Sequence, residues 1–543
     1  MKEQSQPRVL IVGAGPSGLM MAHELARFGV PFMIIERDLK KSSYSRAIGV
    51  QIRTLEIFHA LSLYSHLAEL AENIGSIEIF TDGRGRITID LPKTTSFFAA
   101  FLTVDQTHTE AVLENALIGR GQSVMRGVEL LSLKEVEEGV KAELLDQQGK
   151  ITSQQFSCVV GADGAHSTVR KSMSNQFSGG SYDDAFILAD AFCANFSGRH
   201  AIHTFFKDTQ FFAMIPMHGE HHYRLISIRR GETTKAGPMP VIDEFRALAK
   251  KVVPFPVEIK TCSWISRFFV QCRSATHYQE DGIFLIGDAA HIHSPAGAQG
   301  MNTGLQDAFN LAWKLAMTLK GLAKPEVLKS YHDERKPVGD FLVDRTDRLF
   351  KFMVKSSIWA RFLRWFVLPR IAQSEKAKRK IARLISQTGI RYDSGILCND
   401  GEHLTNMGLE LGVRAPNLSL MSSVLKKTDL HTLITDLHFS WVFFLPENVG
   451  KKQVLDAVHL RERFEKRWPK TCKVFLVFAR DFEAEKAVME ADYYVSINPS
   501  PSFIFEEASY IITRPDHHVF CLGLLSEIDH AEKSLQRFLM ESV

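Results

Sequence analysis

Six residues near the N-terminus have types and spacing that can bind a pyrophosphate. Gly13-Ala14-Gly15-Pro16-Ser17-Gly18 fits the pattern G-x-G-x-x-G. In this pattern Gly13 permits a tight turn, Gly15 lets the backbone approach the phosphates, and Gly18 lets a helix pack closely on a strand. Glu36 follows at the end of the next apolar run, where its carboxylate can accept hydrogen bonds from a ribose hydroxyl. The pattern predicts a dinucleotide site for an unphosphorylated ribose, as in FAD or NAD, and does not distinguish the two.

Two further loops of small residues follow apolar runs. Ala162-Asp163-Gly164 follows the apolar residues Val159-Val160, and Gly287-Asp288 follows the run Ile283 to Ile286. The segment 294–304 after the second loop is rich in small residues and leads into a helical pattern. Small residues let the backbone pass close to a planar ligand, and a helix N-terminus stabilises negative charge, such as that of a reduced flavin ring. Three such loops together predict one large, extended ligand.

The elements that must position these loops can be read from hydrophobic periodicity. Residues 9–12 and 32–35 are apolar runs typical of buried parallel strands, and a helical pattern lies between them at 19–28. Further expected elements are helices at 54–72, 107–119, 302–319 and 340–388, short aromatic-rich strands over 180–280, and apolar strands at 441–445, 473–478 and 519–522. This order predicts a nucleotide-binding domain with an inserted sheet, followed by a small third α/β domain.

Together the three loops resemble the fingerprints of the class A flavoprotein monooxygenases, which have the p-hydroxybenzoate hydroxylase fold, over residues 7–345. Ser45-Arg46-Ala47 and Asp105-Gln106-Thr107 are weaker matches. In the tail, 412–416 and 513–516 resemble the phenol hydroxylase branch, whose members carry a thioredoxin-like third domain. The tail lacks C-x-x-C, so no disulfide chemistry is implied.

The resemblance implies an α/β fold class: a Rossmann-like FAD-binding domain with an inserted mixed β-sheet substrate domain and a C-terminal thioredoxin-like domain. The expected boundaries are 1–180 for the first part of the FAD-binding domain, 181–280 for the substrate-binding sheet domain, 281–345 for the return of the FAD-binding domain, 346–400 for a helical linker, and 401–543 for the thioredoxin-like domain.

The same resemblance implies roles along FAD. Gly13, Gly15 and Gly18 would hold the pyrophosphate, and Glu36 and Arg37 the adenosine end. Arg46 and Gln106 would bind further along, with Arg46 near the flavin. Asp288 would bond the ribityl chain, and the ring would be lined by Gly300, Met301 and Asn302. Asp163 and Arg170 would belong to the motif shared by FAD and a transient nicotinamide cofactor. The chain has no second G-x-G-x-x-G, as in the family, which lacks a separate nicotinamide domain.

The activity that the resemblance implies is hydroxylation of an aromatic substrate, phenolic or polyketide-like, with NADPH or NADH and O₂ through a hydroperoxyflavin. No catalytic acid or base can be assigned from the sequence. An antibiotic-modifying monooxygenase and a catalytically silent flavin-binding module remain alternatives. A flavin-dependent halogenase is disfavoured because the segment W-x-W-x-I-P is absent.

One departure from the family concerns the substrate. Phenol hydroxylases of this branch often carry an aspartate where Ala47-Ile48-Gly49 has Ile48. An apolar pocket at Ile48 would favour a bulky, largely hydrophobic aromatic over simple phenol. The alternative is that Tyr223 or Arg224 supplies phenol activation, and the sequence leaves open whether these two face a phenolate or solvent.

Several other residues have two interpretations. The Phe-rich segment 205–212 can line an apolar pocket or form sheet core. His291 and His293 are expected beside the flavin rather than at a metal, because no cysteine or carboxylate cluster is near them. The pairs His221-His222 and His517-His518 are expected to be solvated. The segment 358–371 is expected to be a helix packed on its own protein, with a membrane-surface helix as the alternative.

Composition limits the remaining choices. A chain of 543 residues is too long for one core, so two or three domains are expected. The 65 basic and 62 acidic residues nearly balance, which argues against a nucleic-acid partner. The seven scattered cysteines indicate reduced thiols and a cytoplasmic protein. No apolar run reaches the ~18 residues of a transmembrane segment. The expected partner is a small-molecule aromatic substrate, and a homodimer is left open.

Overall fold

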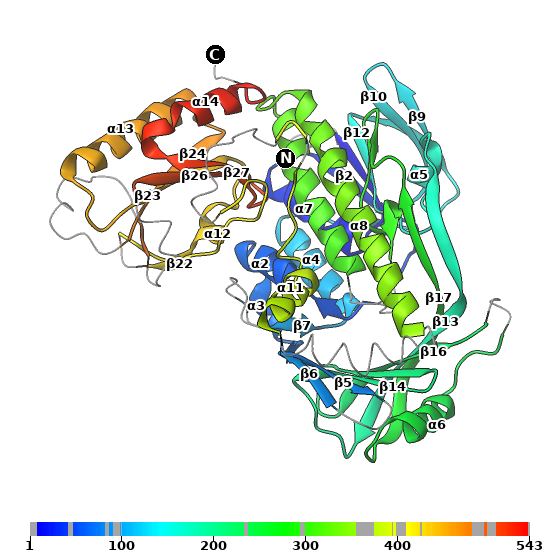
Figure 1. The fold of residues 1–543 in the computed structure, drawn as a ribbon. Helices are drawn as coiled ribbons and strands as arrows, with labels where there is room; N and C mark the ends of the chain where they lie inside the picture. The colour runs from blue at the N-terminus through cyan, green and yellow to red at the C-terminus, as the bar shows by residue number, and fades with distance from the viewer. Residues whose placement is uncertain are drawn as a thin grey trace.

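The computed structural model of the chain (Figure 1) describes residues 8–41, 47–81, 86–90, 98, 100–232, 237–293, 299–354, 374–393, 395–397, 409–423, 426–479, 494–496 and 507–540. The predicted flavin contact Arg46 and the segment 358–371 lie outside these residues. None of the described helices is long and apolar enough to cross a membrane.

The glycine loops follow strands of a six-stranded sheet with the order β18-β19-β12-β1-β2-β8. Its strands are β1 (Val9–Val12), β2 (Phe32–Glu36), β8 (Met125–Arg126), β12 (Cys158–Gly161), β18 (Gln279–Glu280) and β19 (Ile283–Leu285). β1, β2, β8, β12 and β19 run parallel, and β18 is antiparallel to β19. This is the Rossmann-like arrangement that the buried runs predicted, and it places the ends of β1, β12 and β19 at one edge.

Helices complete this region. α1 (Pro16–Arg27) packs against α4 (Gln106–Gly119) and α7 (Gly300–Leu319). α1 begins three residues before the predicted start because Pro16 occupies its first position, where a missing N–H costs nothing. The single helix predicted at 54–72 is wrong: α2 (Ile52–Ala60) and α3 (Tyr64–Ala68) are separated at Ser62, which has a φ of 61°. Around them lie β3 (Gly49–Val50), β4 (Glu72–Ile74), β7 (Phe101–Thr103), α5 (Thr168–Ser172) and the sheet of β9 (Glu129–Val136), β10 (Gly139–Leu145) and β11 (Ile151–Phe156).

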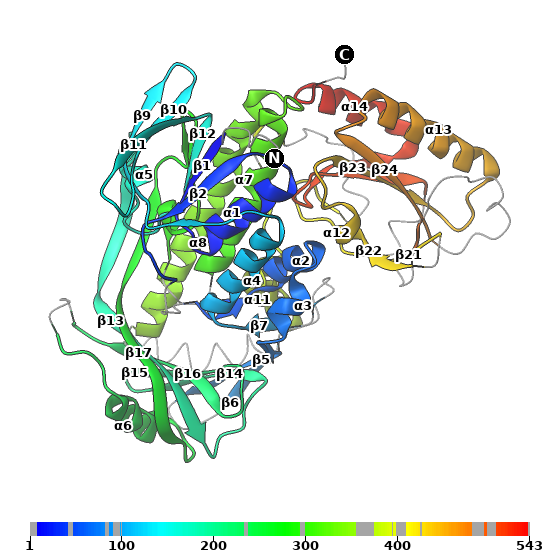
Figure 2. The ribbon, with the colours of Figure 1, turned by 180° about the vertical axis from the view of Figure 1, so that it is seen from behind.

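A second large sheet lies beside the first (Figures 1 and 2) and has the order β20-β17-β13-β16-β15-β14-β5-β6. Its strands are β5 (Ser76–Thr81), β6 (Arg86–Asp90), β13 (Phe177–Ala194), β14 (Ala201–Lys207), β15 (Gln210–Pro216), β16 (His222–Arg229), β17 (Glu258–Ala275) and β20 (His291–Ile292). The sheet is mixed, because β14 and β5 are parallel and the other pairs are antiparallel. α6 (Ile242–Val252) contacts β14, β15 and β17.

The expectation of short strands over 180–280 is wrong for two of them. β13 and β17 have 18 residues each and connect the two sheets. Their pairing shifts register at Ser181/Ala185, Asp190/Ala191 and Phe192/Cys193. Each shift interrupts the alternation of inward and outward side chains, so a long strand resembles several short ones in sequence.

The C-terminal region is a seven-stranded sheet with the order β22-β21-β25-β24-β23-β26-β27. Its strands are β21 (Ser419–Ser422), β22 (Lys427–Asp429), β23 (Phe439–Leu445), β24 (Cys472–Phe478), β25 (Tyr494–Ser496), β26 (Ser509–Thr513) and β27 (Val519–Leu524). Its helices are α12 (Leu430–Leu433), α13 (Lys451–Arg467) and α14 (Asp529–Gln536). α8 (Lys329–Val354) and α11 (Glu375–Ile385) precede it in the chain.

The C-terminal sheet is joined to the nucleotide-binding region by buried polar groups. Arg514 donates to both oxygens of Glu334 on α8, at 2.6 and 2.8 Å. His517 and His518 lie beside this junction and are 0% and 5% exposed, so the expectation that they are solvated is wrong. His517 Nε2 lies 2.8 Å from Thr435 Oγ1. The turn signals next to these histidines are real, but the turn packs against another part of the chain.

Candidate functional site

The glycine loop between β1 and α1 packs against the end of β12. Gly13 has a φ of +101°, and a Cβ there would lie 2.5 Å from the carbonyl oxygen of Ala162. A Cβ at Gly18 would overlap the carbonyl oxygen of Gly13. At Gly15, by contrast, a Cβ would meet nothing within 4 Å. Gly13 and Gly18 are therefore required by packing, whereas Gly15 borders open space.

Glu36 lies against this loop at the end of β2. Its Oε2 accepts a hydrogen bond from the backbone N–H of Ala14 at 2.9 Å, and its Oε1 accepts one from Asp38 at 3.1 Å. Arg37 beside it is exposed, with its Nε 3.7 Å from Asp38 Oδ1. The acid and the glycine loop that the sequence paired are thus in direct contact.

Asp163, in the second loop, is used by the protein itself. Its Oδ1 accepts from Ser167 Oγ at 2.5 Å, and its Oδ2 accepts from the N–H groups of Thr168 and Val169 at 2.7 and 3.1 Å. These bonds satisfy the first turn of α5. Burial raises the pKa of Asp163, and the hydrogen bonds oppose that rise. Asp163 therefore holds the shape of its loop.

Arg170, on α5, connects the second loop to the third. It donates from Nη1 to the carbonyl oxygen of Ala289 at 2.7 Å and from Nη2 to that of Ala165 at 2.8 Å. Its guanidinium stacks 3.7 Å from the ring centre of Phe177. Asp288, the residue before Ala289, is exposed in the short helix η1 (Gly287–Ala289). Arg170 thus fixes the backbone next to Asp288.

The two loop histidines belong to a buried hydrogen-bonded chain. His293 Nε2 lies 2.8 Å from His291 Nδ1, and His291 Nε2 lies 2.7 Å from Asp307 Oδ2. Burial opposes ionisation of Asp307, but Arg335 and His291 together hold its pKa at about 2. Burial lowers the pKa of His293 well below its usual value, so it is neutral. Its Nδ1 is buried and has no hydrogen-bond partner among the residues that the structure describes. Among the residues that the structure describes, no group of His, Cys, Asp or Glu could hold a metal ion.

The N-terminus of α7 completes this edge of the sheet. Gly300 and Met301 are the first residues of the helix. Asn302 is buried, accepts from the N–H of Gln51 at 2.8 Å, and donates to the carbonyl oxygen of Gly49 at 2.8 Å. Gln106 accepts at 3.3 Å from the N–H of Ala47. Asn302 and Gln106 therefore hold the segment 47–51 from both ends.

These groups fit a bound FAD. The three loops follow the ends of β1, β12 and β19 in one parallel sheet, where dinucleotides bind in such folds. The open space at Gly15 suits a pyrophosphate, and Glu36 beside it suits a ribose. Within the described part of the chain, the buried Nδ1 of His293, ahead of α7, has no partner, and a polar group of a bound ligand would satisfy it.

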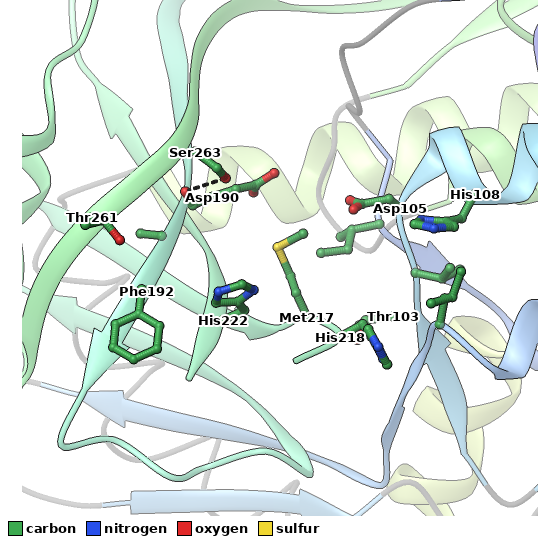
Figure 3. Close-up of a pocket in the computed structure, with 14 residues that line it drawn as sticks. Thr103, Asp105, His108, Asp190, Phe192, Met217, His218, His222, Thr261 and Ser263 are labelled. Carbon is green, nitrogen blue, oxygen red and sulfur yellow. Dashed lines mark hydrogen bonds between the residues drawn. The ribbon is translucent and has the colours of Figure 1, made fainter. Parts of the chain in front are cut away.

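A cavity of about 260 Å³ lies between this region and the second sheet (Figure 3). Its lining residues come from the segment beside Asn302, from β7, α4, β13, β16 and β17, and from the connections that precede β4, α4 and β16: Ile48, Leu70, Thr103, Val104, Asp105, His108, Asp190, Ala191, Phe192, Met217, His218, His222, Thr261 and Ser263. Ile48 lines the cavity, as its family position implied. The prediction of an apolar pocket is wrong for the cavity as a whole, because eight of the fourteen lining residues are polar. The volume is just below the ~300–1,000 Å³ usual for small-molecule sites.

Arg224 lies behind the cavity and is fully buried. It donates from Nε and Nη2 to the two oxygens of Asp190, at 2.7 Å each, and its Nη2 lies 3.4 Å from Asp105 Oδ1. Tyr223 faces the other side of β16, and its hydroxyl lies 3.4 Å from the carbonyl oxygen of Phe196. Burial raises the pKa of Tyr223 to about 12. Tyr223 therefore belongs to the sheet core, and Arg224 reaches the cavity only through its partners.

Sequence reasoning missed Asp190 and His222 as cavity residues. Neither lies in a glycine-rich motif, and only alternation along β13 and β16 sets the face on which they lie. The Phe-rich segment resolves as core, because Phe205 and Phe212 are both fully buried in the cluster that packs under α6.

Comparisons with known proteins agree with this site. The sequence profile of the "FAD binding domain" family matches residues 6–346. The rifampicin monooxygenase of Streptomyces venezuelae is 31% identical over 389 residues, which cover 71% of this chain and 80% of that protein. The 6-methylpretetramide 4-monooxygenase of Streptomyces rimosus is 35% identical over 63% of this chain and 62% of that protein. The crystal structure of CabE, an aromatic hydroxylase from angucycline biosynthesis, superposes with a TM-score of 0.76 at 26% identity, covering 97% of this chain and 99% of that one.

The chain belongs to the FAD-dependent aromatic monooxygenases of class A, with an additional C-terminal sheet domain. Its expected reaction class and its FAD requirement are thereby confirmed.

Proposed function

We propose that this monooxygenase hydroxylates a multi-ring phenolic compound of polyketide type and takes its electrons from NADPH or NADH. The observation that carries the proposal is the cavity between the FAD-binding edge and the second sheet, which joins Ile48, Phe192 and Met217 to carboxylates and imidazoles. Such a lining suits an aromatic body that bears hydroxyl groups. Relatives named for rifampicin and 6-methylpretetramide support the larger substrate class.

The roles proposed for individual residues rest on the family resemblance and on the contacts described above. We propose that the loop from Gly13 to Gly18 binds the FAD pyrophosphate, and that Glu36 and Arg37 hold the adenosine end. Asp288, exposed beside the fixed carbonyl of Ala289, would bond the ribityl chain. The flavin ring would be lined by Gly300, Met301 and Asn302. Gln106 and Arg46 would bind further along the cofactor, with Arg46, which lies outside the described residues, near the flavin. Asp163 would contribute to FAD binding by holding the shape of its loop rather than by direct contact with the cofactor.

Bound FAD would supply the redox chemistry, in which NAD(P)H provides two electrons, one atom of O₂ enters the substrate ring and the other leaves as water. The chain contributes binding, orientation and exclusion of water. The helix dipole at the start of α7 favours negative charge near Gly300. Burial lowers the pKa of His293 and so favours its neutral form.

We propose that the C-terminal region is a thioredoxin-like domain. Its central strands have the order β24-β23-β26-β27, with α13 joining the parallel pair β23 and β24 and α14 following the antiparallel pair β26 and β27. We retain the boundaries 1–180, 181–280, 281–345, 346–400 and 401–543 for the parts of the chain. The six described cysteines are free thiols, which supports a cytoplasmic location.

A coupled assay tests the substrate proposal. NADPH and NADH oxidation and hydroxylated product are measured with phenol, a substituted phenol and a multi-ring phenolic compound. The multi-ring compound is expected to give the highest coupled kcat/KM, because the apolar part of the lining, Ile48, Phe192 and Met217, can bury more of its ring surface at ~25 cal/mol per Å². If unsubstituted phenol gives the highest value, the substrate class is wrong, although the monooxygenase assignment stands.

A further inference from the structure

The described lining of the cavity contains two carboxylates, Asp105 and Asp190, and no Lys or Arg. Arg224 behind the wall is the guanidinium that both carboxylates share. Three histidines, His108, His218 and His222, line the same cavity.

Asp190 is the more firmly held of the two acids. Both of its oxygens accept a hydrogen bond from Arg224 at 2.7 Å, so its carboxylate plane is fixed. Ser263 Oγ donates at 3.2 Å to the backbone carbonyl of Asp190, which holds the main chain as well. Burial raises the pKa of the Asp190 carboxyl, and the bonds from Arg224 oppose that rise. A carboxylate offers about four acceptor positions, and the bidentate pair uses two, so Asp190 retains capacity to accept from a ligand.

We infer that Asp190 determines specificity: it accepts a hydrogen bond from a neutral hydroxyl group on the substrate ring, and Arg224 acts as the positioning residue for its carboxylate. This inference rests on the proposed function and names the substrate chemistry of the same cavity. An aryl ether cannot donate this bond and leaves the acceptor unsatisfied. An aromatic carboxylate places a negative charge against the carboxylates of Asp190 and Asp105 in the cavity wall. The cavity thus selects neutral phenols over both.

The first test uses the FAD-loaded enzyme and three probes of equal ring size: α-naphthol, its methyl ether and α-naphthoate. Dissociation constants are measured from the change in flavin absorbance on titration, without turnover. Naphthol is expected to bind about 10- to 100-fold more tightly than the ether, as for a hydrogen bond to a charged group, and naphthoate is expected to bind more weakly than naphthol. This comparison needs no variant.

The second test repeats the titrations with Asp190→Asn and, as the matched control, Asp105→Asn, each shown to retain FAD. Asp190→Asn keeps an oxygen for Arg224 and is expected to remove most of the preference for naphthol over the ether, while Asp105→Asn keeps it. Equal affinities for naphthol and ether in the wild type overturn the inference alone. An unchanged preference for naphthol in Asp190→Asn also overturns the inference. Tighter binding of naphthoate than of naphthol overturns it as well, and assigns control of specificity to the three histidines. If none of the probes binds, the proposed function fails together with the inference.

Discussion

Replacement of Gly15 by alanine separates cofactor binding from folding within one loop. Gly15 has a φ of −74°, which alanine adopts readily, and its new Cβ would meet no protein atom within 4 Å. The folded protein should therefore lose no stability, and removal of a glycine from the unfolded chain can add up to ~1 kcal/mol. The methyl group nevertheless occupies the space through which the backbone approaches the pyrophosphate. Loss of one charge-assisted hydrogen bond there costs ~1.5–3 kcal/mol, so the Kd for FAD should rise roughly 10- to 100-fold.

Gly13→Ala is the matched control, because it should destabilise the folded protein, which Gly15→Ala should not. At a φ of +101° the new Cβ would lie 2.5 Å from the carbonyl oxygen of Ala162, and the left-handed conformation alone costs ~1–2 kcal/mol. Thermal unfolding of the FAD-free proteins should show a lower Tm for Gly13→Ala and an unchanged or slightly higher Tm for Gly15→Ala. Fluorescence titration gives the FAD affinities. The reasoning is refuted if Gly15→Ala binds FAD like the wild type or is destabilised as much as Gly13→Ala.

Two further predictions concern polar contacts that stabilise the fold around the FAD-binding edge. Asp163→Ala should lower the free energy of unfolding by ~1–2 kcal/mol, as for loss of a helix N-cap. The reason is that the hydrogen bonds to Ser167, Thr168 and Val169 at the start of α5 are lost. A denaturant titration that matches the wild type would show that these bonds contribute little. His59 on α2 lies 2.8 Å from Asp429 of the C-terminal sheet, and this hydrogen bond raises the pKa of His59. The pair should therefore stabilise fully below the ordinary histidine pKa of ~6.5 and lose its effect as pH rises through the raised pKa. His59→Gln should flatten the pH dependence of Tm in that window, and identical slopes in variant and wild type would contradict the assignment.

The FAD-binding edge could be predicted from sequence because its signals are local. Gly13, Gly18 and Glu36 act within one βαβ unit, where a strand, a turn and a helix fix their relative positions. Asp163 was placed in the correct loop, but its three partners belong to the helix that follows, and a motif alone does not show which atoms a carboxylate satisfies.

The substrate cavity could not be predicted because its residues come from strands far apart in the chain. Asp190 and Arg224 meet through the antiparallel pairing of β13 and β16, and register shifts in β13 hide its alternation. His517 and His518 illustrate the same limit. A turn beside them indicates a surface loop, but only the tertiary structure shows that another region covers it.

The most direct test of the central claim is the origin of the oxygen atom in the product. FAD-loaded enzyme is supplied with NADPH or NADH, isotopically labelled O₂ and a panel of multi-ring phenols, and the products are analysed by mass spectrometry. The account predicts a hydroxylated product that contains one labelled oxygen atom for each NAD(P)H consumed in coupled turnover. Hydrogen peroxide without hydroxylated product from every member of the panel, or a product oxygen derived from water, would contradict it.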